Sequence, residues 1–126
     1  MDPKIWGPVA WETFFLFSRN YPEKINLNDK EHLKIMKSTE RFYKSLKDLL
    51  PCMYCRESYK MYYAELDIKK YLSGRDKLTE WLYLLKDKVN KKLICQELDK
   101  GKVTTKQSPS LKSIIKKYDK KGMTKI

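Results

Sequence analysis

The spacing of Cys52 and Cys55 makes this pair the clearest candidate for chemistry in the sequence. With two residues between them, one helical turn brings both sulfurs within bonding distance. Pro51 precedes the pair and favours the start of a helix, which places Cys52 at a helix N-terminus. Unpaired backbone N–H groups and the helix dipole stabilise a thiolate there, and Arg56 adds positive charge nearby. The motif therefore predicts a nucleophilic, redox-active pair.

Other interpretations of the cysteines stay open from spacing alone. A structural zinc site takes four ligands, commonly as two close pairs. Cys95 and the single histidine, His32, are the other candidates, and neither stands beside a second ligand, so we expect no metal site. A thioredoxin-like site needs strands around its motif, whereas two inert buried thiols would need nothing more. We expect Cys95 to be inert or to bond another chain, and His32 to lie on the surface.

The composition limits the class of protein. The chain has 126 residues, of which 41% are hydrophobic, and its 28 Lys and Arg against 16 Asp and Glu give a net charge of +12. This length suits one domain. No apolar run approaches the roughly 18 residues of a membrane span. The first residues also lack a charged region followed by an apolar block, so we expect no secretory signal and a cytoplasmic location.

Hydrophobic residues recur at helical spacing almost throughout the chain. The pattern predicts four helices and a short basic fifth one, over residues 6–17, 29–50, 52–63, 78–93 and 109–118. Asn28 or Asp29 is the expected cap of the second helix, and Ser108 is the expected cap of the fifth, with Pro109 as its first residue. No alternating strand pattern is present. The expected fold is all-α, a four-helix bundle followed by a short additional C-terminal helix.

The C-terminal part of the chain differs in composition from the rest. Residues 91–126 hold 11 Lys and 3 acidic residues, and Tyr118 is the only one of 16 aromatic residues after Tyr83. We therefore place the domain in residues 1–95 and expect residues 96–126 to form a poorly anchored, partly helical basic extension. Such a charge indicates an anionic partner, which could be a phosphate-bearing cofactor, nucleic acid or a membrane surface.

The order of these motifs resembles that of the small flavin-dependent sulfhydryl oxidases of the Erv/ALR family. The family pattern opens with Trp-Gly-Pro, a second tryptophan and Tyr-Pro, matched here by Trp6-Gly7-Pro8, Trp11 and Tyr21-Pro22. A helix ending in Pro-Cys-x-x-Cys follows, matched by residues 51–55. The last element has a tryptophan and then His-Asn-x-Val-Asn-x-x-Leu, matched by Trp81 and residues 86–93. The short, lysine-rich chain most resembles the versions carried by large cytoplasmic DNA viruses.

Four positions depart from the family pattern. The histidine four residues after the second tryptophan is Phe15 here, and the His-Asn pair is Lys86-Asp87. The lysine that commonly follows the leucine by two residues is Cys95. Phe15 can still stack on an aromatic ring, and Lys86 can take over as a phosphate partner. The redox pair itself is intact.

The resemblance implies an FAD-dependent thiol oxidase in which four helices enclose FAD and the disulfide of Cys52 and Cys55 lies beside the isoalloxazine ring. It implies that a substrate dithiol attacks Cys52 through a mixed disulfide, that Cys55 passes two electrons to the flavin, and that O2 accepts them as H2O2. The cofactor-binding residues that it implies are Gly7, Trp11, Phe15, Trp81, Lys86, Asp87, Val89, Asn90, Lys92 and Leu93.

The resemblance also implies partners and a location. The electron donor would be a protein dithiol, thioredoxin-like or another viral redox protein, and the acceptor would be O2. A second copy of the chain is expected in a homodimer, with the first two helices at the interface. The expected location is the host cytoplasm or the virion, with no membrane span and no bound nucleic acid.

Two alternative functions remain at this point. A basic helical protein could contact nucleic acid, although the lysines are spread over several helices and no helix-turn-helix or zinc-finger pattern is present. A degenerate relative could keep the bundle as a docking scaffold without flavin, which the replaced histidines make conceivable. A flavin spectrum that persists in the purified protein separates the oxidase from both.

Overall fold

The fold is taken from a computed structural model of the chain, which describes residues 2–99, 101 and 109–122 and the side chains of residues 2–93, 101 and 109–120. The described elements are, in chain order, α1 (Pro3–Arg19), α2 (Lys30–Leu49), α3 (Met53–Glu65), the 3-10 helix η1 (Ile68–Tyr71), α4 (Arg75–Asp99) and α5 (Leu111–Gly122). None of these residues lies in a β-strand. The all-α prediction is confirmed.

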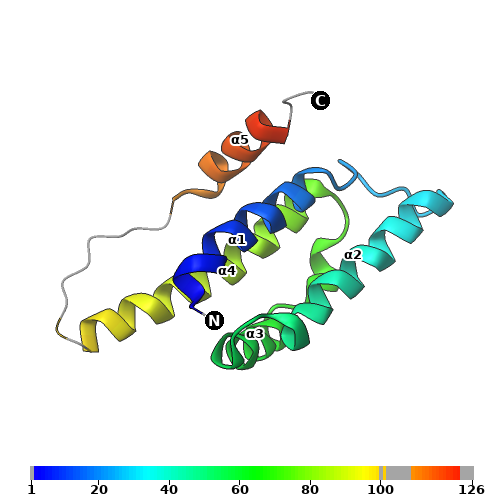
Figure 1. Ribbon diagram of the computed structural model, residues 1–126. Coiled ribbons are helices and arrows are strands. Elements are labelled where there is room, and N and C mark those ends of the chain that lie inside the picture. The colour runs from blue at the N-terminus through cyan, green and yellow to red at the C-terminus, as the bar shows by residue number, and fades with distance from the viewer. Residues whose placement is uncertain (1, 100, 102–108, 123–126) are drawn as a thin grey trace.

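Four helices are arranged around one interior, as Figure 1 shows. Helices α1 and α4 pack along each other, α3 packs against both α2 and α4, and α5 lies against α1 and α4. The predicted four-helix bundle with an additional C-terminal helix is therefore present. No helix within the described residues has the length and hydropathy needed to cross a bilayer.

The first two helices begin at aspartate caps. The Asp2 carboxylate accepts a hydrogen bond from Lys4 N at 2.9 Å, and Pro3 takes the first helical position, where its missing N–H has no cost. Helix α1 therefore starts before the predicted boundary, and Pro8 lies within it. Asp29 caps α2 as predicted, accepting from the backbone N–H of Glu31 at 2.9 Å.

A tight backbone contact joins the α1–α2 connection to the start of α4. The Arg75 N–H donates to the Pro22 carbonyl and the Ile25 N–H donates to the Ser73 carbonyl, both at 2.9 Å. A Cβ atom at Gly74 would overlap the carbonyl oxygen of Glu23, so only glycine permits this approach. The contact fixes where α4 begins and hence which of its residues face α1.

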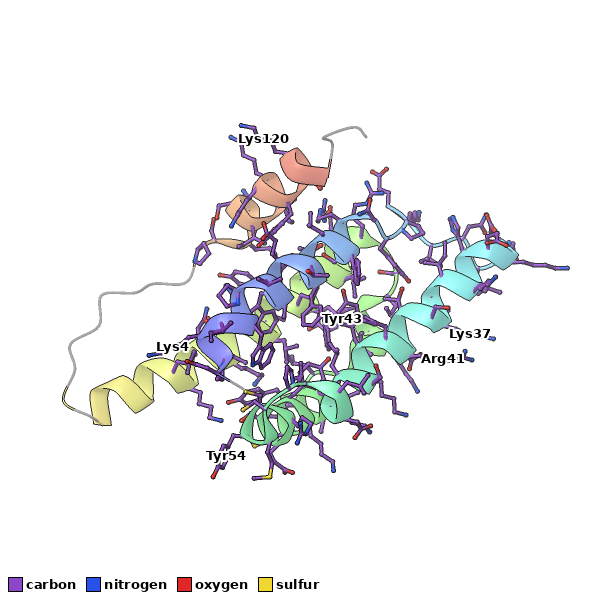
Figure 2. All side chains as sticks on the ribbon, viewed as in Figure 1. Lys4, Lys37, Arg41, Tyr43, Tyr54 and Lys120 are labelled. Carbon is purple, nitrogen blue, oxygen red and sulfur yellow. The ribbon has the colours of Figure 1, made fainter. Side chains whose placement is uncertain are left out.

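The interior is packed with aromatic rings. Tyr43 of α2 points between the helices in Figure 2, its ring centroid lies 5.4 Å from that of Trp81, and its hydroxyl donates to the Phe14 carbonyl at 2.9 Å. Burial raises the pKa of Tyr43, which keeps its hydroxyl a neutral donor. Trp81 is fully buried, and its Nε1–H donates to the Leu66 carbonyl at 3.0 Å. Each buried polar group on these two rings therefore has a partner.

Helix α5 belongs to the packed domain, which corrects the prediction of a poorly anchored extension. Ile114 and Tyr118 are buried, and the Tyr118 ring stacks on Phe15 with centroids 5.3 Å apart and planes at 10°. The Asp119 carboxylate accepts two hydrogen bonds from the buried Arg19 guanidinium, at 2.7 and 3.0 Å. The sequence did not predict this packing, because α5 is rich in lysine. A helix of only about three turns needs few apolar residues, here Ile114 and Tyr118, to form a buried face.

The start of α5 also differs from the prediction. The helix begins at Leu111, two positions after Pro109, and the hydroxyl of Ser110 accepts from Ser113 N at 3.2 Å. Ser110 is thus the capping residue, and Ser108 lies outside the described residues. Helix α4 continues past its predicted end at residue 93, although no side chain beyond that residue is described.

Candidate functional site

The cysteine pair lies where the chain turns from α2 into α3. Leu50 has an extended backbone because it precedes Pro51, and this ends α2. Cys52 is the N-cap of α3, with φ −134° and ψ 128°, and its Sγ accepts a hydrogen bond from Cys55 N at 3.4 Å. The sulfur thus takes the place that an oxygen commonly takes in a cap. Both cysteines are free thiols, as neither forms a disulfide.

The two thiols differ sharply in their tendency to ionise. The Cys55 thiol and backbone N–H both donate to the sulfur of Cys52, and these hydrogen bonds lower the pKa of Cys52. Burial, together with the hydrogen bond and the charge of the neighbouring sulfur, raises the pKa of Cys55 to about 11. Cys52 is therefore the more acidic thiol of the pair, and Cys55, which packs against the core, is the less acidic one.

Arg56 does not act on the pair as the sequence suggested. Its Nη1 donates to the Leu50 carbonyl at 2.7 Å, which is one of the carbonyls left without a partner at the end of α2. The guanidinium thus ties the last turn of α2 to the first turn of α3. Hydrogen bonding to Cys52, rather than the charge of Arg56, lowers the pKa of that thiol.

A small cavity of about 10 Å³ lies among α1, α4 and α5. It brings together four of the predicted cofactor residues, Phe15, Lys86, Asp87 and Asn90. Sequence reasoning missed the other residues of its lining, which are Tyr83, Pro109 and Ile114. Tyr83 precedes Lys86 by three residues on a helix, so its place on the same face was readable from the sequence. No feature of the sequence indicated that Pro109 and Ile114, near the start of α5, line this cavity.

The cavity holds a positive charge without a counter-ion in the described part of the chain. Burial and the nearby charge of Lys117 lower the pKa of Lys86. No described side chain forms a salt bridge with Lys86, whereas Asp87 is paired with Lys91 at 3.0 Å. A lysine of the cavity lining is thus influenced by the charge of a second lysine on another helix, and a positive charge of this kind suits a phosphate.

The remaining predicted cofactor residues lie outside the cavity lining. Trp81 is enclosed by core rings and its N–H is already bonded, so packing accounts for it fully. Trp11 is half-buried beside Phe15, at 6.3 Å between ring centroids, and Val89 is half-buried against the core. Leu93 is half exposed, and Lys92 contacts the Ser58 hydroxyl on α3. A side chain added at Gly7 would meet no described atom within 4 Å.

Two further observations bear on whether FAD fits these residues. The Nε1–H of Trp6 is buried and has no acceptor among the described atoms, which is costly unless another group supplies one. Lys86 lacks an anion in the same part of the structure. The carbonyls and phosphates of FAD are acceptors and anions, so these residues fit its chemistry. The cavity is far smaller than the roughly 300–1,000 Å³ of typical ligand pockets, so a dinucleotide would extend well beyond it.

Among the described residues, no group of three or more His, Cys, Asp or Glu side chains is arranged to hold a metal ion. His32 is half-buried, and its Nδ1 accepts from Asn26 N at 2.9 Å. Its side chain therefore holds the backbone of the loop before α2 by a hydrogen bond. The side chain of Cys95 lies outside the described residues, so its predicted roles stay predictions.

Two known proteins are similar to this chain, one in sequence and one in fold. The protein named "Putative FAD-linked sulfhydryl oxidase 096R" of Invertebrate iridescent virus 3 is 28% identical over 93 residues, which cover 74% of this chain and 59% of that protein. The chain thus matches less than two thirds of the length of this relative. The crystal structure of the yeast Erv1 core aligns with a TM-score of 0.73 at 19% identity, covering 94% of this chain and 84% of that one, and so shows the same fold.

The family itself is established by a match over most of the chain. The model of the Erv1 / Alr family matches residues 8–109, a range that includes α2, α3, α4 and the cysteine pair. The matched range extends past the end of α4 at Asp99 and stops at residue 109, two positions before α5 begins at Leu111. The chain belongs to the Erv1 / Alr family.

Proposed function

We propose that this protein is an FAD-dependent thiol oxidase that forms disulfide bonds in substrate proteins. The observation that carries the proposal is the asymmetric pair at the start of α3, an accessible Cys52 of lowered pKa in front of a more buried Cys55. Membership of the Erv1 / Alr family supports it, as does the name of the viral relative. The chemistry that FAD supplies when bound is two-electron transfer from a dithiol to O2, which yields H2O2.

The cysteines perform the exchange with the substrate. In the oxidised protein a substrate thiolate attacks Cys52 Sγ, a substrate–Cys52 disulfide forms, and the bond to Cys55 breaks. The second substrate thiol loses its proton and attacks the mixed disulfide, so that Cys52 leaves as a thiolate. The substrate gains a disulfide, and the protein pair gains two electrons and two protons. Exposure decides the direction of attack, because Cys55 is the more buried of the two sulfurs.

Residues of the cavity would hold the cofactor. Lys86 would pair with a phosphate, Asn90 would bond polar atoms of the cofactor, and Phe15 would contact a ring. The buried N–H of Trp6 would donate to an acceptor on the ligand. Asp87 also lines the cavity, whereas Gly7, Trp11, Val89 and Leu93 remain candidates for contact from the resemblance alone.

Partners and location remain proposals as well. The electron donor is a protein with a reduced cysteine pair, and the acceptor is O2. We also propose a homodimer, supported by the exposed apolar side chains on α1, which are Ile5, Val9 and Phe17. The host cytoplasm or the virion stays the predicted location.

The purified protein tests the function directly. We expect a flavin absorption spectrum that persists through gel filtration, consumption of O2 with a small dithiol, and formation of H2O2. Cys55→Ser should abolish O2 consumption and keep the flavin spectrum. A colourless chain that binds no added FAD would favour the non-catalytic scaffold, and salt-sensitive binding to duplex DNA without oxidase activity would favour the nucleic-acid alternative.

A further inference from the structure

Lys92 lies on the part of α4 that faces α3, and it does not line the cavity. Its half-buried ammonium contacts the hydroxyl of Ser58 on α3. Ser58 follows Cys55 by three residues, so the two side chains share one face of α3 and lie about 5–6 Å apart at their Cβ atoms. The contact therefore holds a positive charge beside the inner cysteine.

Cys55 is the group on which this charge acts. Among the described side chains, two charged groups influence its ionisation, the sulfur of Cys52 on the same helix and the ammonium of Lys92 on α4. The Cys52 sulfur raises the pKa of Cys55, and Lys92 lowers it. Arg56 is nearer along the chain, yet its guanidinium is bonded to the Leu50 carbonyl. Lys92 is thus a side-chain cation on α4 that the fold directs to the inner sulfur.

We propose that Lys92, anchored by Ser58, is a positioning residue that stabilises the Cys55 sulfur when disulfide exchange releases it as a thiolate. The inference rests on the proposed function and gives Lys92 a different role from the cofactor contact that the family resemblance implies. When the substrate thiolate bonds to Cys52, the electron pair of the broken bond stays on Cys55 Sγ. A leaving thiol of lower pKa departs faster, so the charge of Lys92 accelerates this step.

The test measures how readily Cys55 ionises in the full chain. Cys52→Ser and Cys95→Ser leave Cys55 as the single thiol, and its alkylation by iodoacetamide is followed against pH with and without Lys92→Met. At pH 8 we expect Lys92→Met to slow alkylation about threefold to tenfold, since a nearby opposite charge that is partly screened lowers a pKa by up to roughly one unit. Lys92→Arg keeps the charge and should restore most of the rate.

Lys88→Met provides the matched control. It removes the same charge one turn earlier on α4, where Lys88 Nζ is paired with Glu65 Oε2 at 2.8 Å on the surface. This variant should leave the alkylation rate within about twofold. Ser58→Ala, which keeps the cation and removes its anchor, should slow the reaction by less than Lys92→Met does.

Two results would overturn the proposal. One is an unchanged rate in a folded Lys92→Met chain, and the other is an equal loss of rate in Lys88→Met, which would show a general charge effect. The alkylation readout needs neither flavin nor O2. A wild-type chain without oxidase activity would therefore refute the proposed function while the alkylation series still decides the influence of Lys92 on Cys55.

Discussion

At the scale of single residues, the site depends on a division of roles between two identical side chains. Cys52 receives hydrogen bonds from the start of α3, so the helix stabilises its charge. Cys55 lies one turn further on, where the core covers it and raises the pKa of its thiol. The same backbone turn thus produces an outer sulfur for exchange and an inner sulfur that keeps its proton.

Replacing Lys86 is predicted to have opposite effects on the stability of the chain and on its affinity for FAD. A half-buried lysine whose pKa is lowered disfavours the folded state while it is charged, and that cost disappears as the pH rises through the lowered pKa. We expect Lys86→Met to raise the melting temperature of the flavin-free chain at pH 7 and to weaken FAD binding about tenfold. Thermal unfolding and a titration with FAD measure the two effects.

The control for this prediction is a lysine on the surface. Lys112→Met removes the same charge from an exposed position of α5, and it should change neither quantity by more than the spread of repeated measurements. If Lys86→Met leaves FAD affinity unaltered, Lys86 has no role as a phosphate partner. If it lowers the stability of the flavin-free chain, a partner for its charge must already exist.

At the scale of helices, the sequence predicted the elements that carry their own signals. Asp29 and Pro51 mark the start of α2 and the approach to α3, because a capping carboxylate and a restricted backbone act locally. Helix α5 was predicted without its packing, since the stacking of Tyr118 on Phe15 joins residues about a hundred positions apart. The role of Lys92 was missed for the same reason, as spacing within α4 says nothing about which residue of α3 it meets.

Asp119 tests how α5 is held. It accepts two hydrogen bonds from the buried Arg19, and this guanidinium holds the pKa of the Asp119 carboxyl below its usual value. The stabilisation is present at neutral pH and is lost as the pH falls through that lowered pKa. We expect Asp119→Asn to lower the free energy of unfolding by about 1–2 kcal/mol at pH 7, with partial compensation by Asp76, which also binds Arg19.

Urea unfolding followed by circular dichroism at neutral and acidic pH measures this effect. The wild type and Asp119→Asn should converge in acid, where the wild-type carboxyl is protonated. Asp48→Asn removes an exposed carboxylate from α2 and should change the free energy of unfolding by less than about 0.5 kcal/mol. Equal stability of wild type and Asp119→Asn at pH 7 would show that α5 is held by Ile114 and Tyr118 alone.

At the scale of the whole molecule, the surface carries apolar side chains that are not buried in the core. Ile5, Val9 and Phe17 expose 71%, 65% and 51% of their surface on α1, although the chain is otherwise rich in charge. Figure 2 shows charged side chains such as Lys37 and Arg41 directed outward from α2. Exposed apolar side chains on one helix are typical of a contact with another protein, which agrees with the proposed homodimer.

The homodimer predicts a specific response to a charge on α1. A glutamate at position 9 would be buried without a partner in a contact made by this helix, at a cost of several kcal/mol. We expect Val9→Glu to convert a dimeric wild type into a monomer, measured by light scattering during gel filtration. Leu27→Glu is the matched control, since Leu27 is 68% exposed but lies in the connection after α1. A monomeric wild type, or an equal loss of dimer in both variants, would rule out α1 as the interface.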